Sequence, residues 1–362
     1  MNLNLYRKSS IILGALLLMA ITAKAQYATR EFSSAEQAYT DSIKNVKYDY
    51  VFPILGQKAY QSGFDVPYSA GVMINTMNMK QHILITDFQL GFHGVNGAGF
   101  DLQDADFIKF GENTSVASTT TIRPDLWVLP FLNVYGLFGY GHSSTDISVS
   151  HLSFAQYSQI PELPINMVAN VKQNIAINGF GVMFAGGFGP LFFTVDANWT
   201  WSKPELLENA LRTQIIGMRV GHVFKNKRKP EKNFGVWVGG MRGTMGGALS
   251  HGSIPLNTLI PASMADKRDQ LVEEYHSWYD GLKPIQQGLV NHTALPEFVD
   301  KLENWNAGGV IEYQFDKRLK AAWNGIIGCQ YQFNKRWMIR SEGGVVGDRK
   351  SFMLSLNYRF CV

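Results

Sequence analysis

The sequence predicts an all-β fold, a transmembrane antiparallel up-and-down β-barrel of about 12 strands (about 10–14) with a small helical insertion. Three observations lead to this fold class: an alternating segment near the C-terminus, an N-terminus typical of an exported protein, and a composition rich in aromatic residues and glycine. A soluble sandwich strand alternates in the same way. The combination of the three observations favours a barrel that crosses a membrane with strands.

Residues 351–360 carry the clearest pattern. One face holds the apolar side chains and the other the mostly polar ones: Phe352, Leu354, Leu356, Tyr358 and Phe360 against Ser351, Met353, Ser355, Asn357 and Arg359. The side chains of a strand alternate between two faces, so this segment is amphipathic. About ten residues of tilted strand cross a bilayer. In a transmembrane barrel the apolar face contacts lipid and the polar face lines the interior.

The N-terminus predicts export. Two basic residues, Arg7 and Lys8, precede an apolar run over residues 11–21, which leads to the small-residue motif A-K-A at 23–25. A positive start, a short apolar core and such a cleavage site are typical of a signal peptide, here residues 1–25. An uncleaved membrane anchor is the alternative, but the run is short for a span.

The composition narrows the class further. The chain is 46% hydrophobic and 13% aromatic and holds 35 glycines, yet beyond the N-terminus no run approaches the roughly 18 apolar residues of a membrane helix. Three of the 33 basic residues and none of the 29 acidic residues lie in 1–25, so the mature chain keeps 30 basic against 29 acidic residues. No basic stripe is present, and no nucleic acid is expected as a partner.

Residues 26–68 form an N-terminal leader that is expected to be partly helical. Ser33, Glu36 and Gln37 resemble a helix start, with a hydroxyl that caps and a Glu or Gln near the third position. A short helix, an extended segment packed at one barrel end and a disordered terminus remain open. The outer-membrane β-barrel is expected over residues 69–362.

Strand candidates follow in series. The first two, 71–79 and 82–92, form an apparent hairpin around the polar pair Lys80 and Gln81, and a polar stretch follows over 94–112. The others, bounded by turn residues, are 114–129, 131–149, 174–188, 191–201, 214–224, 234–245, 309–315, 325–333, 337–345 and 351–360. An even number of strands is expected for a bacterial single-chain barrel.

Proline and glycine punctuate these strands. Pro130 cannot donate a ladder hydrogen bond and is expected at a turn or a strand edge, and Gly189 with Pro190 predicts a tight turn. The basic run 225–232 is more typical of a solvated hairpin end than of a binding patch. Glycines inside strands either bend the barrel or make room in its lumen, and both explanations stay open for Gly179, Gly181, Gly186, Gly187, Gly235, Gly239, Gly240, Gly243, Gly246 and Gly247.

Residues 262–305 break the strand pattern and are helical in character. One apolar stripe at helical spacing consists of Leu271, Val272, Tyr275, Trp278, Tyr279 and Leu282. Gly281 and Pro284 are expected to end this helix, and a second, shorter helix starts near Pro296. Amphipathic helices must bury their stripes, so the pair packs on itself, caps the barrel mouth or plugs the lumen.

The strand count leaves the side of this insertion unresolved. Counting back from Phe360 as a periplasmic end places residues 246–305 in the periplasm. Taking the short turn at Pro130 as periplasmic places them on the opposite side. One strand is therefore miscounted.

The C-terminal segment, closing on Tyr358-Arg359-Phe360, resembles that of bacterial (Gram-negative) outer-membrane β-barrel proteins, in an uncharacterised subfamily. Residues 125–140 and 323–360 also resemble the hairpins of such barrels. The resemblance implies a cell outer membrane location, contact with outer-membrane lipid and lipopolysaccharide, and insertion by the barrel-assembly machinery through the last strand. The departure is Cys361 and Val362 after the terminal Phe. The likeness covers architecture over residues 70–360 and reaches no family of known substrate.

Residues that carry chemistry are sparse. The sequence predicts no catalytic, metal or cofactor site. No two of the eight histidines stand at metal-ligand spacing: they are His82, His93, His142, His151, His222, His251, His276 and His292. Cys329 and Cys361 do not make a disulfide framework, and Cys329 is expected on the lipid face.

One short motif suggests an enzyme. His142 and Ser144 are two apart on a strand and share a face, and a Ser beside a His can act as a nucleophile. This spacing resembles that of the outer-membrane lipid hydrolases, the phospholipase and the lipid A deacylase. In those enzymes Asn follows the Ser, whereas here it is Thr145. Gln156 and Asp146 are the candidates for the group that orients the His.

Charged residues on the expected inner faces point to transport or to plugging. Asp196, Arg340, Glu342 and Arg359 either line a solute path or hold a plug by ion pairs. The leading hypothesis is non-enzymatic: a channel or transporter for small or apolar solutes, with the helical insertion capping or plugging the barrel. An outer-membrane lipid hydrolase using His142 and Ser144, and a structural or adhesion barrel, are the alternatives.

Overall fold

The computed structural model describes residues 34–93, 99–154, 160–226, 229, 231–246, 250–255, 265–303 and 309–362. The expected signal peptide, residues 1–25, lies outside the described residues. Fourteen strands of the described chain form one antiparallel sheet. No described helix has the length and apolar character needed to cross a membrane.

Ten of the described strands close into a barrel, because the first strand pairs on one side with the last strand and on the other side with β4. In order around the ring they are β1 (Ala70–His93), β14 (Lys350–Phe360), β13 (Trp337–Gly347), β12 (Trp323–Gln332), β9 (Asn233–Met245), β8 (Leu211–Lys225), β7 (Leu191–Pro204), β6 (Leu163–Phe188), β5 (Leu132–Leu152) and β4 (Asn113–Leu129). The prediction of an antiparallel barrel of about 12 strands, within about 10 to 14, is confirmed.

The exterior of this ring is apolar and its interior polar. On β14 the side chains of Phe352 and Leu354 are 54% and 46% exposed, whereas Ser355 and Asn357 are 2% and 1% exposed. A soluble barrel buries the apolar face instead, so the outside of this one is matched to lipid. The predicted amphipathic pattern of residues 351–360 is confirmed.

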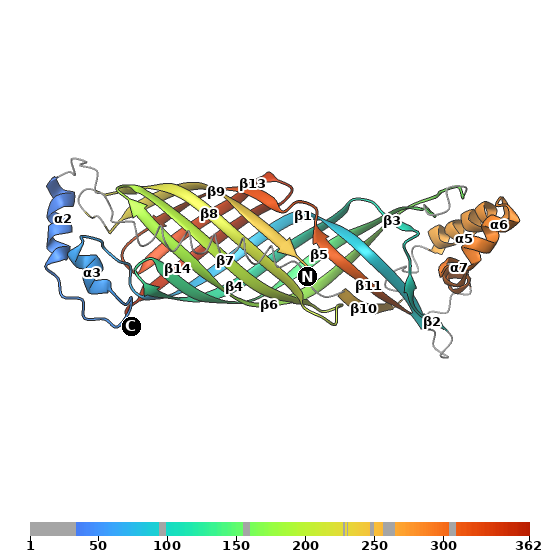
Figure 1. The fold of residues 1–362 in the computed structure, drawn as a ribbon, viewed down its shortest axis with the longest axis horizontal. Helices are drawn as coiled ribbons and strands as arrows, with labels where there is room; N and C mark the ends of the chain where they lie inside the picture. Colours follow the sequence, from blue (N-terminus) through green and yellow to red (C-terminus); the bar gives the residue numbers. More distant parts are fainter. Residues whose placement is uncertain are drawn as a thin grey trace, which may run out of the picture.

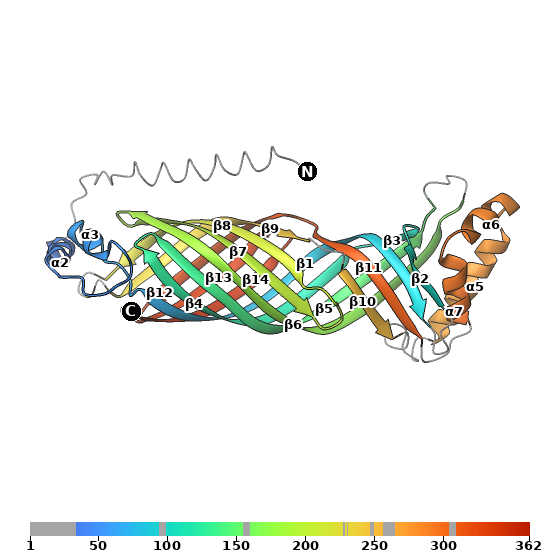
Figure 2. The same ribbon diagram turned by 60° about the horizontal axis from the view of Figure 1, so that its bottom comes forward.

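The barrel continues beyond the membrane-type ring as an extension of seven strands. It consists of the distal parts of β1, β5 and β6 together with β2 (Gly99–Asp104), β3 (Ile108–Phe110), β10 (Ser250–Pro255) and β11 (Val310–Leu319). Figures 1 and 2 show these strands prolonging one end of the barrel.

The predicted hairpin around Lys80 and Gln81 is wrong. β1 runs unbroken through both residues and changes partner instead: residues up to Lys80 pair with β14, and residues from Ile83 pair with β11. The polar pair marks the point where the strand leaves its membrane-type partner for the extension. Such a polar pair resembles a turn in sequence, but only Lys80 is exposed, whereas Gln81 is buried and accepts from Arg349 Nε at 3.0 Å.

The predicted membrane strand 309–315 is also misplaced. β11 occupies this region but pairs with β1 and β10 in the extension and takes no part in the ring. Removing it from the count resolves the contradiction over residues 246–305. Counting back from β14 and counting forward from Pro130 now place the insertion at the same end of the barrel.

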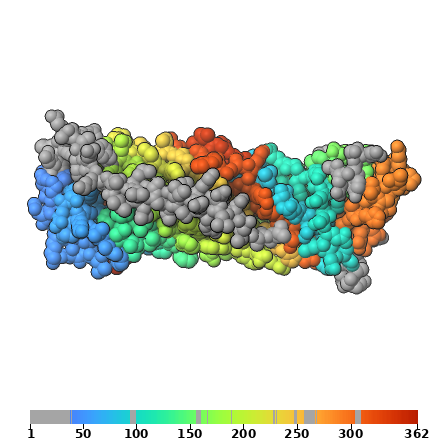
Figure 3. All heavy atoms as spheres, viewed as in Figure 1, coloured from blue at the N-terminus to red at the C-terminus, as the bar shows by residue number. Residues whose placement is uncertain are grey.

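Helices cover both ends of the molecule (Figure 1). α2 (Ser34–Lys44) and α3 (Gly56–Gln61) lie at the end that carries the C-terminus, where Ile54 N donates to Val128 O at 2.9 Å. α5 (Ala265–Asp280), α6 (Pro284–Asn291) and α7 (Leu295–Glu303) lie at the opposite end, beyond the extension. Figure 3 shows the elongated molecule that results.

The helical insertion is confirmed, with one helix more than predicted. α5 carries the predicted apolar stripe, and α7 begins beside Pro296. α6 is the additional helix: Pro284, which was expected to end α5, stands in the first turn of α6. The stripe packs into a buried cluster with Val290, Val299 and Leu302 and with strands of the extension. The helices therefore cap the barrel mouth.

Candidate functional site

A cavity of about 210 Å³ lies inside the extension, beneath α5 and α7. Its wall is made by side chains of β1, β5, β6 and β11 and is closed on the helical side by Tyr275, Leu295 and Phe298, among others. Nearly every lining side chain is apolar. An engineered apolar cavity of roughly 150 Å³ holds a benzene molecule, so this space admits a small apolar body.

The alternation of β6 builds one wall. Every second residue from Leu163 to Gln173 lines the cavity, and Val168, Asn170 and Lys172 between them are exposed, Val168 at 53%. A strand with a period of two produces this arrangement. Here the inward side chains are apolar, which is the reverse of the inward Ser355 and Asn357 of β14.

A bulge in β1 keeps a second wall apolar. Ile83 and Ile85 line the cavity, and so do Phe88 and Leu90, although the spacing changes by one residue between the two pairs. The ladder with β11 shifts between Thr86 and Gln89, and Asp87 takes a left-handed φ of 53°. An extra residue at a bulge reverses which side chains face inward, so both pairs reach the cavity.

The deep end of the cavity, toward the ring, is the polar one. The lining residues nearest the ring are Ile83 on β1, Thr145 on β5, Gln173 on β6 and Lys317 on β11. Burial lowers the pKa of the Lys317 ammonium to about 8. Lys317 pairs with Ile85 in the strand register, which sets its position relative to the ring. Within the described chain no carboxylate lies within ion-pair distance of Lys317, and the neighbouring Asp316 pairs with Arg318.

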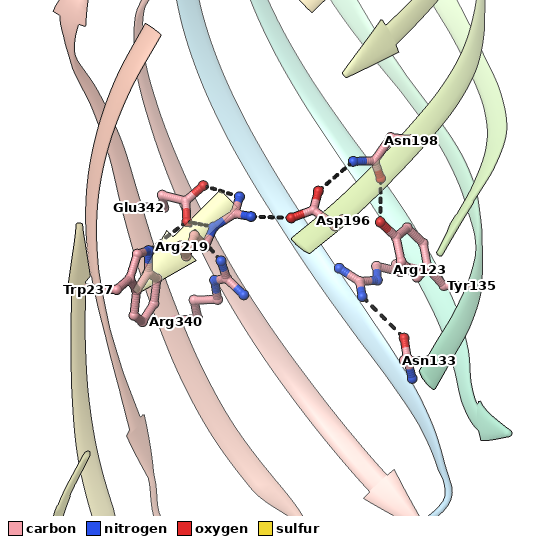
Figure 4. A network of polar contacts seen from close by, with 9 residues as sticks. All are labelled: Arg123, Asn133, Tyr135, Asp196, Asn198, Arg219, Trp237, Arg340 and Glu342. Atoms are coloured by element: carbon pink, nitrogen blue, oxygen red, sulfur yellow. Dashed lines mark hydrogen bonds and ion pairs between the residues drawn. The ribbon is translucent and has the colours of Figure 1, made fainter. Parts of the chain in front are cut away.

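Inside the ring, charged and polar side chains of several strands form one network of contacts (Figure 4). The Arg219 guanidinium donates to Glu342 through Nε at 2.7 Å and Nη2 at 2.8 Å, and it also pairs with Asp196. Arg340 Nη2 and Trp237 Nε1 each donate to Glu342 Oε2 at 2.8 Å. Bidentate pairs of this kind are the strong ones.

The network reaches across to the opposite wall. Asn198 Nδ2 donates to Asp196 Oδ2 at 2.9 Å, and the Tyr135 hydroxyl donates to Asn198 Oδ1 at 2.6 Å. The Arg123 guanidinium lies 3.6 Å from the centre of the Tyr135 ring. Nearer the C-terminal end, Arg359 Nη2 donates to Asp125 Oδ1 at 3.0 Å. Side chains of seven ring strands thus meet in the lumen.

The four charges singled out in the sequence all belong to these contacts. Asp196 and Glu342 both pair with Arg219, and Arg340 pairs with Glu342. Arg359 pairs with Asp125, which also accepts from Asn133. The sequence left open a solute path or a plug held by ion pairs, whereas these charges pair with other residues of the barrel wall. Arg219 was missed because its neighbours Met218 and Val220 make the segment look like an ordinary lipid-facing strand.

Two glycines make room for the aromatic members of the network. Gly181 stands opposite Tyr135 and Gly328 opposite Trp237 in the strand register. A Cβ would lie 2.5 Å from the Tyr135 ring at the first position and 2.4 Å from the Trp237 ring at the second. Both rings therefore lie over bare backbone, which supports the explanation that small residues create space inside the lumen.

His142 and Ser144 lie on the outer face of β5, along a shallow cleft that Asn174 and Glu205 also line. His142 Nδ1 is hydrogen-bonded to Asn174 Oδ1, its direct cross-strand neighbour. Asn174 Nδ2 donates to Glu205 Oε1 at 2.8 Å. The His partner is thus Asn174.

The two candidates for that partner are not in place. Asp146 Oδ1 accepts instead from Asn170 Nδ2 at 2.5 Å, and Gln156 lies outside the described residues. Asn170 Nδ2 also donates to Ser144 Oγ at 2.8 Å. No hydrogen bond joins His142 to Ser144 in the described part of the chain.

The remaining chemistry is limited. Cys329 and Cys361 are both free and half-buried. Over the residues that the structure describes, no group of three His, Cys, Asp or Glu side chains is arranged to hold a metal ion.

No family model and no curated protein matches the chain. Among solved structures it is similar to the beta domain of the Bordetella autotransporter Brka, at 9% identity over 81% of this chain and 100% of that chain, with a TM-score of 0.33. The translocator domain of autotransporter NalP from Neisseria meningitidis is 11% identical over 84% and 92% of the two chains, with a TM-score of 0.32. The Ralstonia pickettii toluene transporter TbuX is 7% identical over 81% and 90%, with a TM-score of 0.27.

These likenesses extend only to the barrel architecture. The closed ring, its lipid-matched exterior and the closing strand β14 are features of this chain itself. The chain is a closed β-barrel of the kind that crosses a membrane with its strands.

Proposed function

We propose that the protein is a non-enzymatic outer-membrane transporter that takes an apolar solute into the cavity beneath α5 and α7. The observation that carries the proposal is the cavity itself: it has a volume of about 210 Å³ and an apolar wall, inside a barrel whose interior is otherwise polar. Apolar pockets with few polar groups are the usual form of small-molecule sites.

The solute would enter from outside the cell. Short turns, such as those after Leu129 and Phe188, lie at the C-terminal end, whereas the longest connections lie at the end with the helices. Outer-membrane barrels have short periplasmic turns and longer extracellular loops. On this orientation α5–α7 face outward, lipopolysaccharide surrounds the outer rim, and residues 355–360 are available to the barrel-assembly machinery before insertion.

We infer that the route below the cavity is closed in the ground state. Arg219, Glu342 and their partners form a network of contacts inside the ring (Figure 4). Passage of a solute therefore requires these ion pairs to separate, and the ground state is expected to conduct little. The helical cap closes the outer end of the same compartment.

The test is binding of the apolar fluorophore 1-N-phenylnaphthylamine to protein in nanodiscs. Wild type is expected to show saturable fluorescence, and Ala169→Trp, which fills the cavity from its wall, is expected to lower the signal at least tenfold. Val168→Trp, one residue away on the outer face of β6, is the matched control and is expected to bind like wild type. Equal binding by all three proteins would refute the proposal.

A lipid hydrolase is the second candidate, favoured by the contact between His142 and Asn174. An amide oxygen only accepts hydrogen bonds, and Glu205 fixes the amide by accepting from its Nδ2. Nδ1 of His142 is then the donor, and Nε2 remains free to act as a base toward a hydroxyl. This is how an orienting group prepares a catalytic His.

Hydrolysis of a phospholipid in mixed micelles separates this candidate from transport. Under the hydrolase hypothesis Ser144→Ala abolishes turnover and Asn174→Ala lowers kcat at least tenfold. Ser143→Ala, whose side chain faces the lumen, is the control. Under the transport proposal none of the proteins hydrolyses lipid.

A further inference from the structure

We propose that the solute carries one anionic head group, a carboxylate, on its apolar body, and that Lys317 binds this head at the deep end of the cavity. The inference rests on the proposed function and names the class of ligand for the same site. It stands on the position of Lys317 among the lining residues and on the absence of a counter-ion for it in the described chain.

Lys317 is held in a place that is unfavourable for a cation. It lines the cavity among Ile83, Ile85 and Phe315, all of them apolar. The acidic residue next to it, Asp316, pairs with Arg318 at 2.8 Å. A buried ammonium without a partner lowers stability, so its place in an otherwise apolar wall is explained by a partner that arrives with the ligand.

Gln173 is a second lining residue that can donate a hydrogen bond. Gln173 Oε1 accepts from Leu206 N at 3.4 Å, which turns the NH₂ group of the amide away from that contact. The Thr145 hydroxyl, in contrast, already donates to Ser115 Oγ at 3.2 Å. An ammonium and an amide NH₂ both donate and match the two oxygens of a carboxylate.

The rest of the cavity suits a hydrocarbon body. From the deep end the wall continues through Val171, Ala169 and Met167 to Leu295 and Phe298 of the helical cap. A head bound at Lys317 would point its tail toward the helices and away from the closed lumen. An amphiphile of medium chain length, such as a ten-carbon acid, satisfies both ends of the site.

The experiment compares three amphiphiles that share a ten-carbon tail: decanoate, decanol and decylammonium. Each displaces 1-N-phenylnaphthylamine from protein in nanodiscs at pH 7, with empty nanodiscs measured in parallel to subtract partition into lipid. Decanoate is expected to compete at least tenfold better than decanol, which equals about 1.4 kcal/mol, and decylammonium to compete worst.

Two variants locate this preference. Lys317→Met is expected to remove it while leaving decanol unchanged, and Lys317→Glu is expected to favour decylammonium. Arg318→Met, exposed on the other face of β11, is the matched control and keeps the preference for decanoate. The melting temperature of Lys317→Met should equal or exceed that of wild type, because the side chain is held for the ligand and not for the fold.

The outcomes distinguish a failure of the assignment of Lys317 from a failure of the proposed function. If the fluorophore binds to the cavity but decanoate and decanol compete equally, the assignment of Lys317 is wrong and the proposed function stands. If the fluorophore shows no binding that Ala169→Trp removes, the proposed function fails and the inference fails with it.

Discussion

The interior of this barrel is built in two opposite ways along its length. Inside the ring, the inward side chains are polar and meet in an ion-paired network around Arg219. Inside the extension, they are apolar and leave a cavity. β6 takes part in both, with Val171 at the cavity and Gly181 under the ring of Tyr135.

This difference shows that one strand can carry a membrane pattern and a soluble pattern in succession. Where the exterior faces lipid, apolar side chains are used outside and the interior is left to polar ones. Where the exterior faces water, the interior becomes the hydrophobic core. The cavity is thus a space in a soluble-type core that stands on top of a membrane-type ring.

Breaking the ion-paired region should give the largest effect. Glu342→Ala removes the acceptor of Arg219, Arg340 and Trp237 and leaves buried guanidinium groups unpaired. We expect a loss of about 3–5 kcal/mol, measured as a lower temperature for the shift between folded and unfolded bands on a gel. Conductance steps in a planar bilayer should also become more frequent.

The control for that experiment is Glu297→Ala, an exposed carboxylate on α7. It should unfold at the wild-type temperature. A Glu342→Ala barrel that is as stable and as silent in the bilayer as wild type would show that the network neither supports nor closes the ring.

Loosening the apolar region should give the next largest effect, and a local one. Leu302 is 2% exposed in the cluster that joins α7 to the extension. Leu302→Ala should cost about 2–5 kcal/mol in the docking of the helices, seen as faster proteolysis within residues 265–303 while the ring stays folded. Ile285→Ala, at 81% exposure on α6, should be cleaved at the wild-type rate.

A change of pH should alter the affinity of the cavity for an anionic ligand. Burial lowers the pKa of Lys317 to about 8, and a carboxylate bound as proposed would raise it. Decanoate affinity should therefore be constant below about pH 8 and fall by up to about tenfold for each pH unit above it. Decanol affinity should not change with pH. A flat decanoate profile up to pH 10 would contradict the role of Lys317.

The smallest effect is expected at the outer face of the extension. His251 is hydrogen-bonded to Glu208 at 2.9 Å and to Glu312 at 2.7 Å, and His93 also contacts Glu312. The hydrogen bond with Glu208 and burial act in opposite directions, and the net effect raises the pKa of His251. Stability from this cluster is present below about pH 6.5 and is lost as pH rises through the raised pKa.

Because these groups are partly hydrated, the effect should stay below about 1 kcal/mol. Hydrogen exchange of β10 and β11 between pH 5 and pH 8 measures it, and His251→Asn should remove the difference. Faster exchange at pH 5 than at pH 8, beyond the intrinsic change, would reverse the predicted sign.

Much of the fold could be read from the sequence because the membrane imposes simple patterns. The alternation of residues 351–360, the apolar stripe of α5 and the charges Asp196 and Glu342 all follow from a period or from a residue type. The errors arose where polarity has two causes. Lys80 and Gln81 resemble a turn but mark the exit of a strand from the membrane-type ring.

The candidate sites were beyond the reach of sequence patterns, because they depend on register. Lys317 stands in the charged run Asp316-Lys317-Arg318, and only its pairing with Ile85 places it in the cavity. Asn174 is recognised as the partner of His142 only when β5 and β6 are aligned residue by residue. A bulge such as the one after Thr86 shifts such an alignment by one residue.

The long strand β1 has a consequence for the order of folding. Its first half closes the ring against the last strand, with Ala70 beside Phe360, and its second half forms a wall of the cavity. Contacts between residues so far apart in the chain form slowly, because the loop between them must be ordered first. The ring is therefore closed only when the whole chain has been delivered and its ends have met, so the solute site proposed on β1 would be complete only in finished molecules.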